Sequence, residues 1–174
     1  FTPVHVIFLE LIMGPTCSIV YENEPMEKGT MQQKPRKMTE TFLNWKELSI
    51  SIIQGLTITA AVLFAYQFAV QKGSSEETTR AMVFTTLIFA NIFLSLVNRS
   101  LVYSLFESFK YKNRLFPLII GATLTLLFAI LYIPIFAGFF HVTGLNIPEL
   151  GMTLLIAATS VLWFEMYKWI KRRK

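Results

Sequence analysis

The chain lacks aspartate altogether, and it holds one cysteine and few charged residues. All 11 acidic residues are glutamate, so an aspartyl nucleophile, an aspartate-based metal cage and a Walker B aspartate cannot lie within these 174 residues. The one cysteine, Cys17, excludes an internal disulfide and a cysteine-built zinc site. Because Cys17 lies in an apolar segment, we expect it to be a small buried side chain rather than a reactive thiol.

The scarcity of charge indicates a membrane protein. Charged residues make up 16% of the chain, against about 25% in soluble domains, and 53% of the residues are hydrophobic. The mean hydropathy is +0.51. The chain opens FTPVHV, with no initiator Met and no basic region before an apolar core. It therefore does not begin as a signal peptide, and we expect it to be a piece of something longer.

Five stretches are long and apolar enough, or nearly so, to cross a hydrocarbon core about 30 Å thick as helices. None shows the strict alternation of a barrel strand. The sequence therefore predicts an all-α polytopic membrane protein, a bundle of five transmembrane helices of which the first is the weakest candidate. Pro134 is expected to kink or end the fourth helix. The expected spans are residues 4–21, 48–70, 81–104, 116–140 and 150–169, with a polar cytoplasmic loop at 22–47.

Lysine and arginine are divided unevenly between the two sets of loops. Fourteen of the 16 lie in loop 22–47, around the connection after the third span, or at the C-terminal tail; Lys72 and Arg80 lie on the opposite side. Since cytoplasmic loops carry the excess of basic residues, the N-terminal end is predicted outside and the tail in the cytoplasm. The net charge of +5 therefore indicates cytoplasmic helix ends and not nucleic-acid binding.

The first span carries both an acid and a helix breaker. Glu10, near its middle, would cost about 2.5–3.5 kcal/mol at the bilayer centre, so it needs a polar cavity, an ion, a partner helix or protonation. Pro15 has no N–H and leaves the carbonyl of Leu11 without its helical partner, while Gly14 loosens the backbone further. We therefore predict an interruption at Gly14-Pro15 that lines a cation path, with a simple proline kink as the alternative.

The candidate cation site combines this acid with nearby groups. On helical spacing Glu10, Met13, Gly14 and Cys17 share a face. A carboxylate beside freed backbone oxygens suits a hard cation, which takes oxygen ligands. Asn91, near the middle of the third span, is a second candidate, although a bond to a neighbouring helix is its simpler interpretation.

Other polar groups are predicted to be structural. His5 and His141 lie on the outside and are isolated in the sequence, so neither is predicted to be a metal ligand. Glu165, with Lys168 three residues on and tryptophans nearby, is typical of an interfacial anchor.

The order of these features resembles the C-terminal membrane region, helices six to ten, of P-type cation-transporting ATPases of the calcium-pump-like bacterial type. PVHVIFLELIMGPTCSIVYENEP resembles helix six, TRAMVFTTLIFANIFLSLVNRS helix eight, and LWFEMYKWIKR the close of helix ten. The resemblance implies that Glu10 matches the first cation ligand of helix six, Met13 a hydroxyl-bearing ligand and Gly14 an acidic one. Asn91 falls where two-site calcium pumps place a carboxylate. Both changes subtract negative charge, so a two-calcium site is not expected; the transported cation stays open, calcium included.

The resemblance also implies a function. The parent protein would be an ATP-driven cation pump using ATP and Mg, phosphorylated on an aspartate that this chain lacks, so the chain alone would not be catalytic and would hold no cofactor. Its partners would be the lipid bilayer, the transported cation, and the remaining helices and cytoplasmic domains of the same pump, in a bacterial plasma membrane. Two alternatives stay open: a non-enzymatic secondary carrier with Glu10 as protonation site, and a purely structural bundle without ion affinity.

Overall fold

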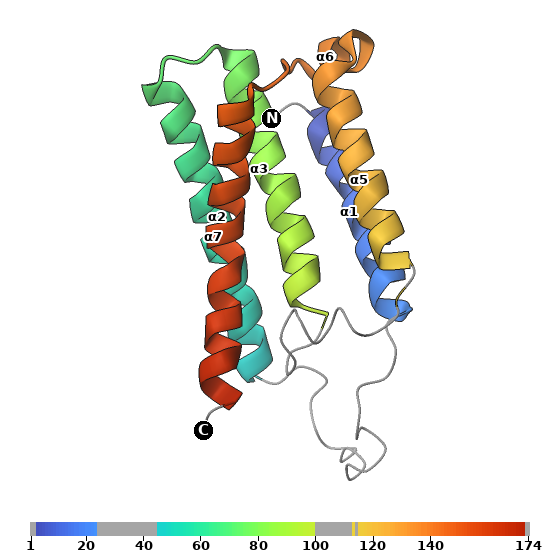
Figure 1. The fold of residues 1–174 in the computed structure, drawn as a ribbon, viewed down its shortest axis with the longest axis vertical. Helices are drawn as coiled ribbons and strands as arrows, with labels where there is room; N and C mark the ends of the chain where they lie inside the picture. The colour runs from blue at the N-terminus through green and yellow to red at the C-terminus, as the bar shows by residue number, and fades with distance from the viewer. Residues whose placement is uncertain (1–2, 24–44, 100–112, 114, 173–174) are drawn as a thin grey trace.

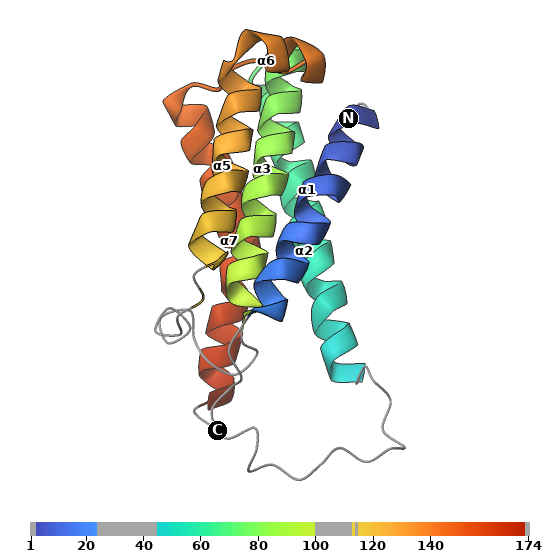
Figure 2. The ribbon, with the colours of Figure 1, turned by 90° about the vertical axis from the view of Figure 1, so that its right-hand side faces the viewer.

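The computed structural model describes residues 3–23, 45–99, 113 and 115–172, and this part of the chain is built from helices without a strand (Figure 1). The prediction of an all-α membrane fragment is thus confirmed. The helices run along the long axis of the molecule, except for the short α6, which lies across one end (Figure 2). They are α1 (Pro3–Glu22), α2 (Trp45–Gln71), α3 (Glu76–Val97), α5 (Leu115–Tyr132), α6 (Pro134–Phe140) and α7 (Ile147–Arg172).

Four of these helices are long and apolar enough to cross a membrane. They comprise residues Leu48–Gln71, Glu76–Val97, Leu115–Tyr132 and Ile147–Ile170. The described part of α1 is not among them, although α1 lies beside α3 and α5 in the bundle. Four of the five predicted spans therefore have a counterpart, and the first stays a prediction. The expected end of the third span and most of loop 22–47 lie outside the described residues.

The expected fourth span is divided where the sequence predicts it. α5 ends at Tyr132, and Pro134 is the first residue of α6. Proline disfavours helical dihedrals in the residue before it, and Ile133 accordingly has extended dihedrals of φ −90° and ψ 118°. Pro134 then suits the first position of a new helix, where no N–H is needed.

α1 corrects one prediction. Every residue from Pro3 to Glu22 is helical, so the predicted interruption at Gly14-Pro15 is wrong as a break in the helix. Proline removes one N–H donor, but the backbone hydrogen bonds before and after it can persist. Membrane helices tolerate such a residue when neighbouring groups or a small local adjustment satisfy the freed carbonyl. The missing donor at Pro15 therefore does not end α1.

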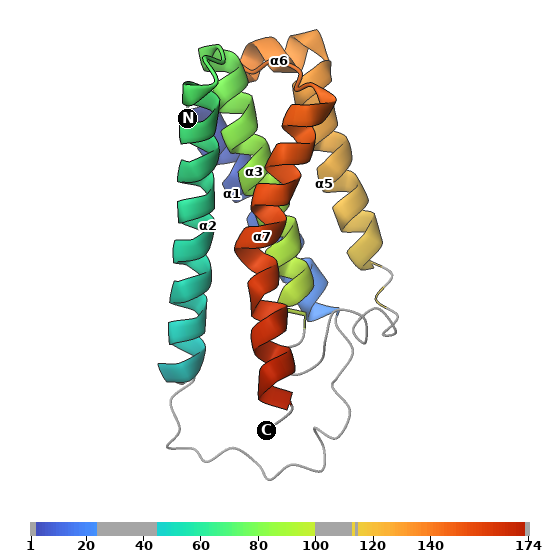
Figure 3. The same ribbon diagram turned by 60° about the vertical axis from the view of Figure 1, so that its left-hand side comes forward.

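All connections with many lysines and arginines start from the same end of the bundle. At this end α1, α3 and α7 finish and α2 and α5 begin (lower end in Figure 1). We call it the basic end, and the opposite end, with the α2–α3 turn and α6, the turn end. α2 and α7, with 27 and 26 residues, are about 40 Å long. They extend beyond α1, α3 and α5 at the basic end (Figure 3).

α3 is the central helix. It packs most extensively on α7 and α2, and it also contacts α5 and α1. In the most apolar part of α3, 56% of the residues are buried, whereas in the corresponding part of α2 only 17% are. Its fully buried side chains include Met82, Phe84 and Ile88, which share the core with Leu127 of α5 and Phe164 of α7. The bundle is therefore organised around α3, with α2 at its periphery.

At the turn end, polar contacts connect the α2–α3 turn to the start of α7. Ser75 caps α3, its side chain accepting a hydrogen bond from the Thr78 N–H at 3.2 Å. Lys72 forms an ion pair with Glu149 at 3.0 Å, and the second carboxylate oxygen of Glu149 accepts from the Asn146 N–H at 3.0 Å. These contacts tie together segments far apart in the sequence.

At the basic end, two side-chain amides join α2 to the end of α3. Gln54 Nε2 donates to Asn98 Oδ1 at 3.1 Å, and Asn98 Nδ2 donates back to Gln54 Oε1 at 3.3 Å. Gln54 is buried, so the loss of its partner would leave a polar group unsatisfied.

We expect Gln54→Ala to lower the free energy of unfolding by about 1 kcal/mol, the size measured for hydrogen bonds between membrane helices. Gln67→Ala, on the exposed side of the same helix, is the matched control and should change it by less than about 0.5 kcal/mol. Detergent-micelle unfolding followed by circular dichroism measures both. Equal losses in the two variants would show that the amide pair does not hold α2 on α3.

Candidate cation site

One face of α1 packs on the bundle and the opposite face is exposed. Val4, Phe8 and Leu9 pack against the core formed with α3 and α5. Glu10 and Gly14, four residues apart, lie on the exposed side. Glu10 makes no hydrogen bond or ion pair with any described residue. The carboxylate in the middle of α1 therefore points to a side that the described helices leave open.

His5 fixes the orientation of α1. Its ring is fully buried and meets Phe84 of α3 and Phe140 of α6 edge-to-face, with centroid distances of 5.0 and 5.4 Å. Phe8, one turn on, meets Phe140 in the same manner at 5.6 Å. The sequence did not indicate that helices distant along the chain enclose His5. It did contain one indication that this side of α1 packs: His5 and Phe8 are three residues apart and lie on the side of the helix opposite Glu10.

Asn91 is half-buried on α3. Its Nδ2 donates to the Leu87 carbonyl of its own helix at 2.9 Å, whereas the simpler interpretation expected a bond to a neighbouring helix. No hydrogen bond joins Asn91 to Glu10 among the described residues. The Oδ1 atom of Asn91 accepts no hydrogen bond from a described residue, so it can accept one from another group.

Of the other residues on this predicted face, the structure describes the surroundings of Gly14 but not the side chains of Met13 and Cys17. Gly14 is exposed, and a Cβ added there would meet no atom within 4 Å, so the space beside it is open. The side chains of Met13 and Cys17 lie outside the described part. In that part, no three histidine, cysteine or glutamate side chains come close enough to hold a metal ion together. The described helices therefore present part of a cation site at most, with Glu10 as its charged group.

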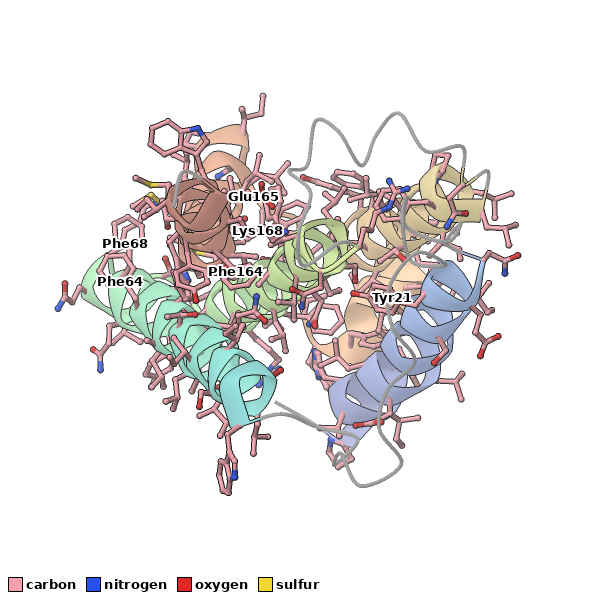
Figure 4. The ribbon with its side chains drawn as sticks, turned by 90° about the horizontal axis from the view of Figure 1, so that it is seen from below. Tyr21, Phe64, Phe68, Phe164, Glu165 and Lys168 are labelled. Atoms are coloured by element: carbon pink, nitrogen blue, oxygen red, sulfur yellow. The ribbon has the colours of Figure 1, made fainter. Side chains whose placement is uncertain are left out.

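Sequence reasoning missed how deeply Lys168 is buried. Only 3% of the residue is exposed, and its Nζ donates to the Val97 carbonyl at the end of α3 and to Glu165 Oε1 at 2.8 Å. Figure 4 shows Glu165 and Lys168 on the side of α7 that faces α3. The predicted anchor pair therefore connects two helices. The i, i+3 spacing indicated the ion pair, but nothing in the sequence indicated the carbonyl of Val97.

A second basic group binds the same helix end to α5. The Arg99 guanidinium lies over the ring of Phe116, 4.5 Å from its centroid. Together with Gln54 and Lys168, it fixes the end of α3 to α2, α5 and α7. Asn91 lies two turns earlier on the same helix.

Comparison with known proteins identifies the family. The chain matches the model of the cation transporting ATPase C-terminus over residues 1–170. It is 25% identical over 152 residues to calcium-transporting ATPase 1 of Schizosaccharomyces pombe, covering 87% of this chain and 17% of that protein. It is 26% identical over 176 residues to calcium-transporting ATPase lmo0841 of Listeria monocytogenes, covering 99% and 19%.

A mammalian relative shows the same extent of similarity. The chain is 24% identical over 164 residues to calcium-transporting ATPase type 2C member 2 of Mus musculus, covering 94% of this chain and 17% of that protein. The chain thus spans less than a fifth of the length of these relatives. With its apolar helices and a family match over nearly its whole length, the chain belongs to the cation-transporting ATPases, as a C-terminal membrane region of these pumps.

Proposed function

We propose that the full-length protein is an ATP-driven pump for a hard cation, in which this chain supplies Glu10 to the cation site and the anchoring helices around it. The observation that carries the proposal is the unpaired carboxylate on the open face of α1. Facing lipid, it would cost about 2.5–3.5 kcal/mol. Facing further helices of the same protein, it can bind a cation instead. The greater length of the relatives leaves room for such helices.

The charge of the candidate residues favours one divalent cation per cycle. Glu10 is the one acid among them, because position 14 is glycine and position 91 is an amide. The amide of Asn91 offers a neutral oxygen, and Met13 offers a thioether. Several curated relatives are named calcium-transporting ATPases, so calcium is the first ion to test.

The remaining parts of the proposal concern the membrane and the energy source. The basic end of the bundle faces the cytoplasm and the N-terminal end of α1 faces outside, as the excess of lysine and arginine favours. ATP and Mg bind to domains beyond this chain. A bacterial plasma membrane is the proposed location, supported by the Listeria relative. The family match favours this pump over a secondary carrier.

Glu10→Gln in the full-length protein is the test. The amide keeps one oxygen ligand and removes the charge, so we expect the calcium concentration for half-maximal ATPase activity to rise about tenfold. Glu77→Gln, an exposed acid at the turn end, is the matched control and should leave it unchanged. ATPase activity and calcium uptake in sealed vesicles measure both. Unchanged calcium dependence in Glu10→Gln would remove Glu10 from the site, and uptake driven by a pH gradient without ATP would favour the carrier.

A further inference from the structure

Four aromatic rings form a cluster where the first turns of α1 meet α3 and α6. This aromatic cluster consists of His5, Phe8, Phe84 and Phe140. Besides the contacts of His5, the centroid of Phe84 lies 5.8 Å from that of Phe8 and 6.1 Å from that of Phe140. His5 and Phe84 are fully buried, and Phe140 is 7% exposed. α6 lies across this end of the bundle (Figure 2). The imidazole therefore occupies the junction of three helices, at the start of the helix that also carries Glu10.

The surroundings of His5 favour an uncharged ring. Full burial penalises the charged form of a histidine, because the imidazolium loses its hydration. A cation gains from contact with the face of an aromatic ring, but this gain is smaller than the loss of hydration of a buried ion. The aromatic cluster therefore holds the neutral imidazole more strongly than the imidazolium.

A positive charge next to the aromatic cluster has the same effect. Arg80 is four residues before Phe84, so the two side chains lie on one side of α3. The Arg80 Nη1 donates to the His141 carbonyl at 2.8 Å, and the other end of the guanidinium is paired with Glu76. The side chain of Glu76 is 86% exposed, so water screens its charge, whereas that of Arg80 is only 17% exposed. A second positive charge, on His5, would be repelled by Arg80.

The other ionisable groups of the helices around His5 do not offset this repulsion. α5 and α6 contain no glutamate, lysine, arginine or histidine, and the Tyr132 hydroxyl of α5 donates to the Leu145 carbonyl at 2.7 Å. Glu77 of α3 is exposed, and Glu10 lies on the opposite side of α1. None of these groups therefore brings a negative charge to the aromatic cluster.

We propose that His5 makes the attachment of α1 to α3 and α6 sensitive to acid. At neutral pH the uncharged ring stays in the aromatic cluster. A ring that leaves the cluster enters water, where histidine takes up a proton at about pH 6.5. Only the released state binds this extra proton, so the equilibrium shifts towards release as the pH falls. Acid at the turn end thus loosens the helix that carries Glu10, whichever ion Glu10 binds.

Cysteine labelling of the full-length protein in detergent micelles measures the release. Val4→Cys places a thiol on the packed side of α1, and Val6→Cys places one on the side that is 54% exposed. A maleimide labels both variants, and mass spectrometry counts the label at each position. The labelling rate at position 4 is divided by that at position 6, which removes the pH dependence of the thiol chemistry. We expect this ratio to rise about tenfold from about pH 7.5 to about pH 5.5, the range in which a released histidine becomes charged. A ratio that does not change with pH would overturn the proposal.

Variants of the two histidines assign the effect. His5→Phe keeps an aromatic ring in the cluster but takes up no proton, so the ratio should change by less than about twofold over the same range. His5→Leu, a second apolar replacement, should behave in the same way. His141→Asn removes the other histidine of the chain, which is exposed, and asparagine tolerates the left-handed φ of 50° at this position. This control should keep the tenfold rise. A full rise in both His5 variants, or its loss in His141→Asn, would refute the role of His5.

Discussion

Replacing Lys168 with methionine is expected to lower the free energy of unfolding by about 3 kcal/mol. Methionine keeps the apolar stem of lysine but removes the donor to the Val97 carbonyl and to Glu165. Lys168 is 3% exposed and the Glu165 side chain 18%, so solvent replaces these contacts poorly. Titration of the 174-residue chain with sodium dodecyl sulfate in maltoside micelles, followed by far-ultraviolet circular dichroism, measures the loss.

Two comparisons separate this contact from a general effect of charge. Lys72→Met removes a lysine from an ion pair of similar geometry, with Glu149, but Lys72 is 48% exposed and the loss should stay below about 1 kcal/mol. Glu165→Gln combined with Lys168→Met should recover about half of the loss, because the group that Lys168 pairs with is then neutral. If the double variant is no more stable than Lys168→Met, the carboxylate is not the source of the loss.

The position of the helices was largely predictable from the sequence, and their ends were less so. The runs of apolar residues follow directly from the length needed to cross a bilayer. α3, however, begins at Glu76, five residues before the predicted span, because Ser75 caps a polar first turn that contains Glu76 and Glu77. Acids suit the start of a helix, but hydropathy counts them against it. Pro134, in contrast, marked its helix boundary correctly because its effect on the backbone is local.

For the candidate site, the sequence identified the charged residue but not the contacts that set its surroundings. The cost of a charge in lipid identified Glu10 without any structure. Which side of α1 carries Glu10 depends on His5 and Phe8 packing between α3 and α6, contacts that join distant segments. α1 continues through Pro15 because the backbone hydrogen bonds on both sides of the proline persist, although one donor is missing. The charge of Lys168 indicated a surface position, and only tertiary packing reveals its burial.

Replacing Gly14 with aspartate is expected to raise the calcium affinity of the full-length protein about thirtyfold, equivalent to about 2 kcal/mol. Position 14 lies one helical turn from Glu10, with about 5–6 Å between the Cβ positions of such residues. A Cβ there meets no atom within 4 Å, so the side chain fits without displacing its neighbours. The new carboxylate adds an oxygen ligand and a negative charge, both of which a divalent cation favours. The calcium dependence of ATPase activity measures the change.

Charge and position are tested separately. Gly14→Asn adds an oxygen ligand without the charge, so we expect it to raise the affinity no more than about threefold. Gly55→Asp adds the same acid to α2, also at an exposed glycine with open space, and should leave the affinity unchanged. An increase in Gly14→Asp alone requires that position 14 and Glu10 face the same ion. Equal affinities in Gly14→Asp and the unaltered protein would instead place this face of α1 away from the cation, even if Glu10→Gln impairs transport.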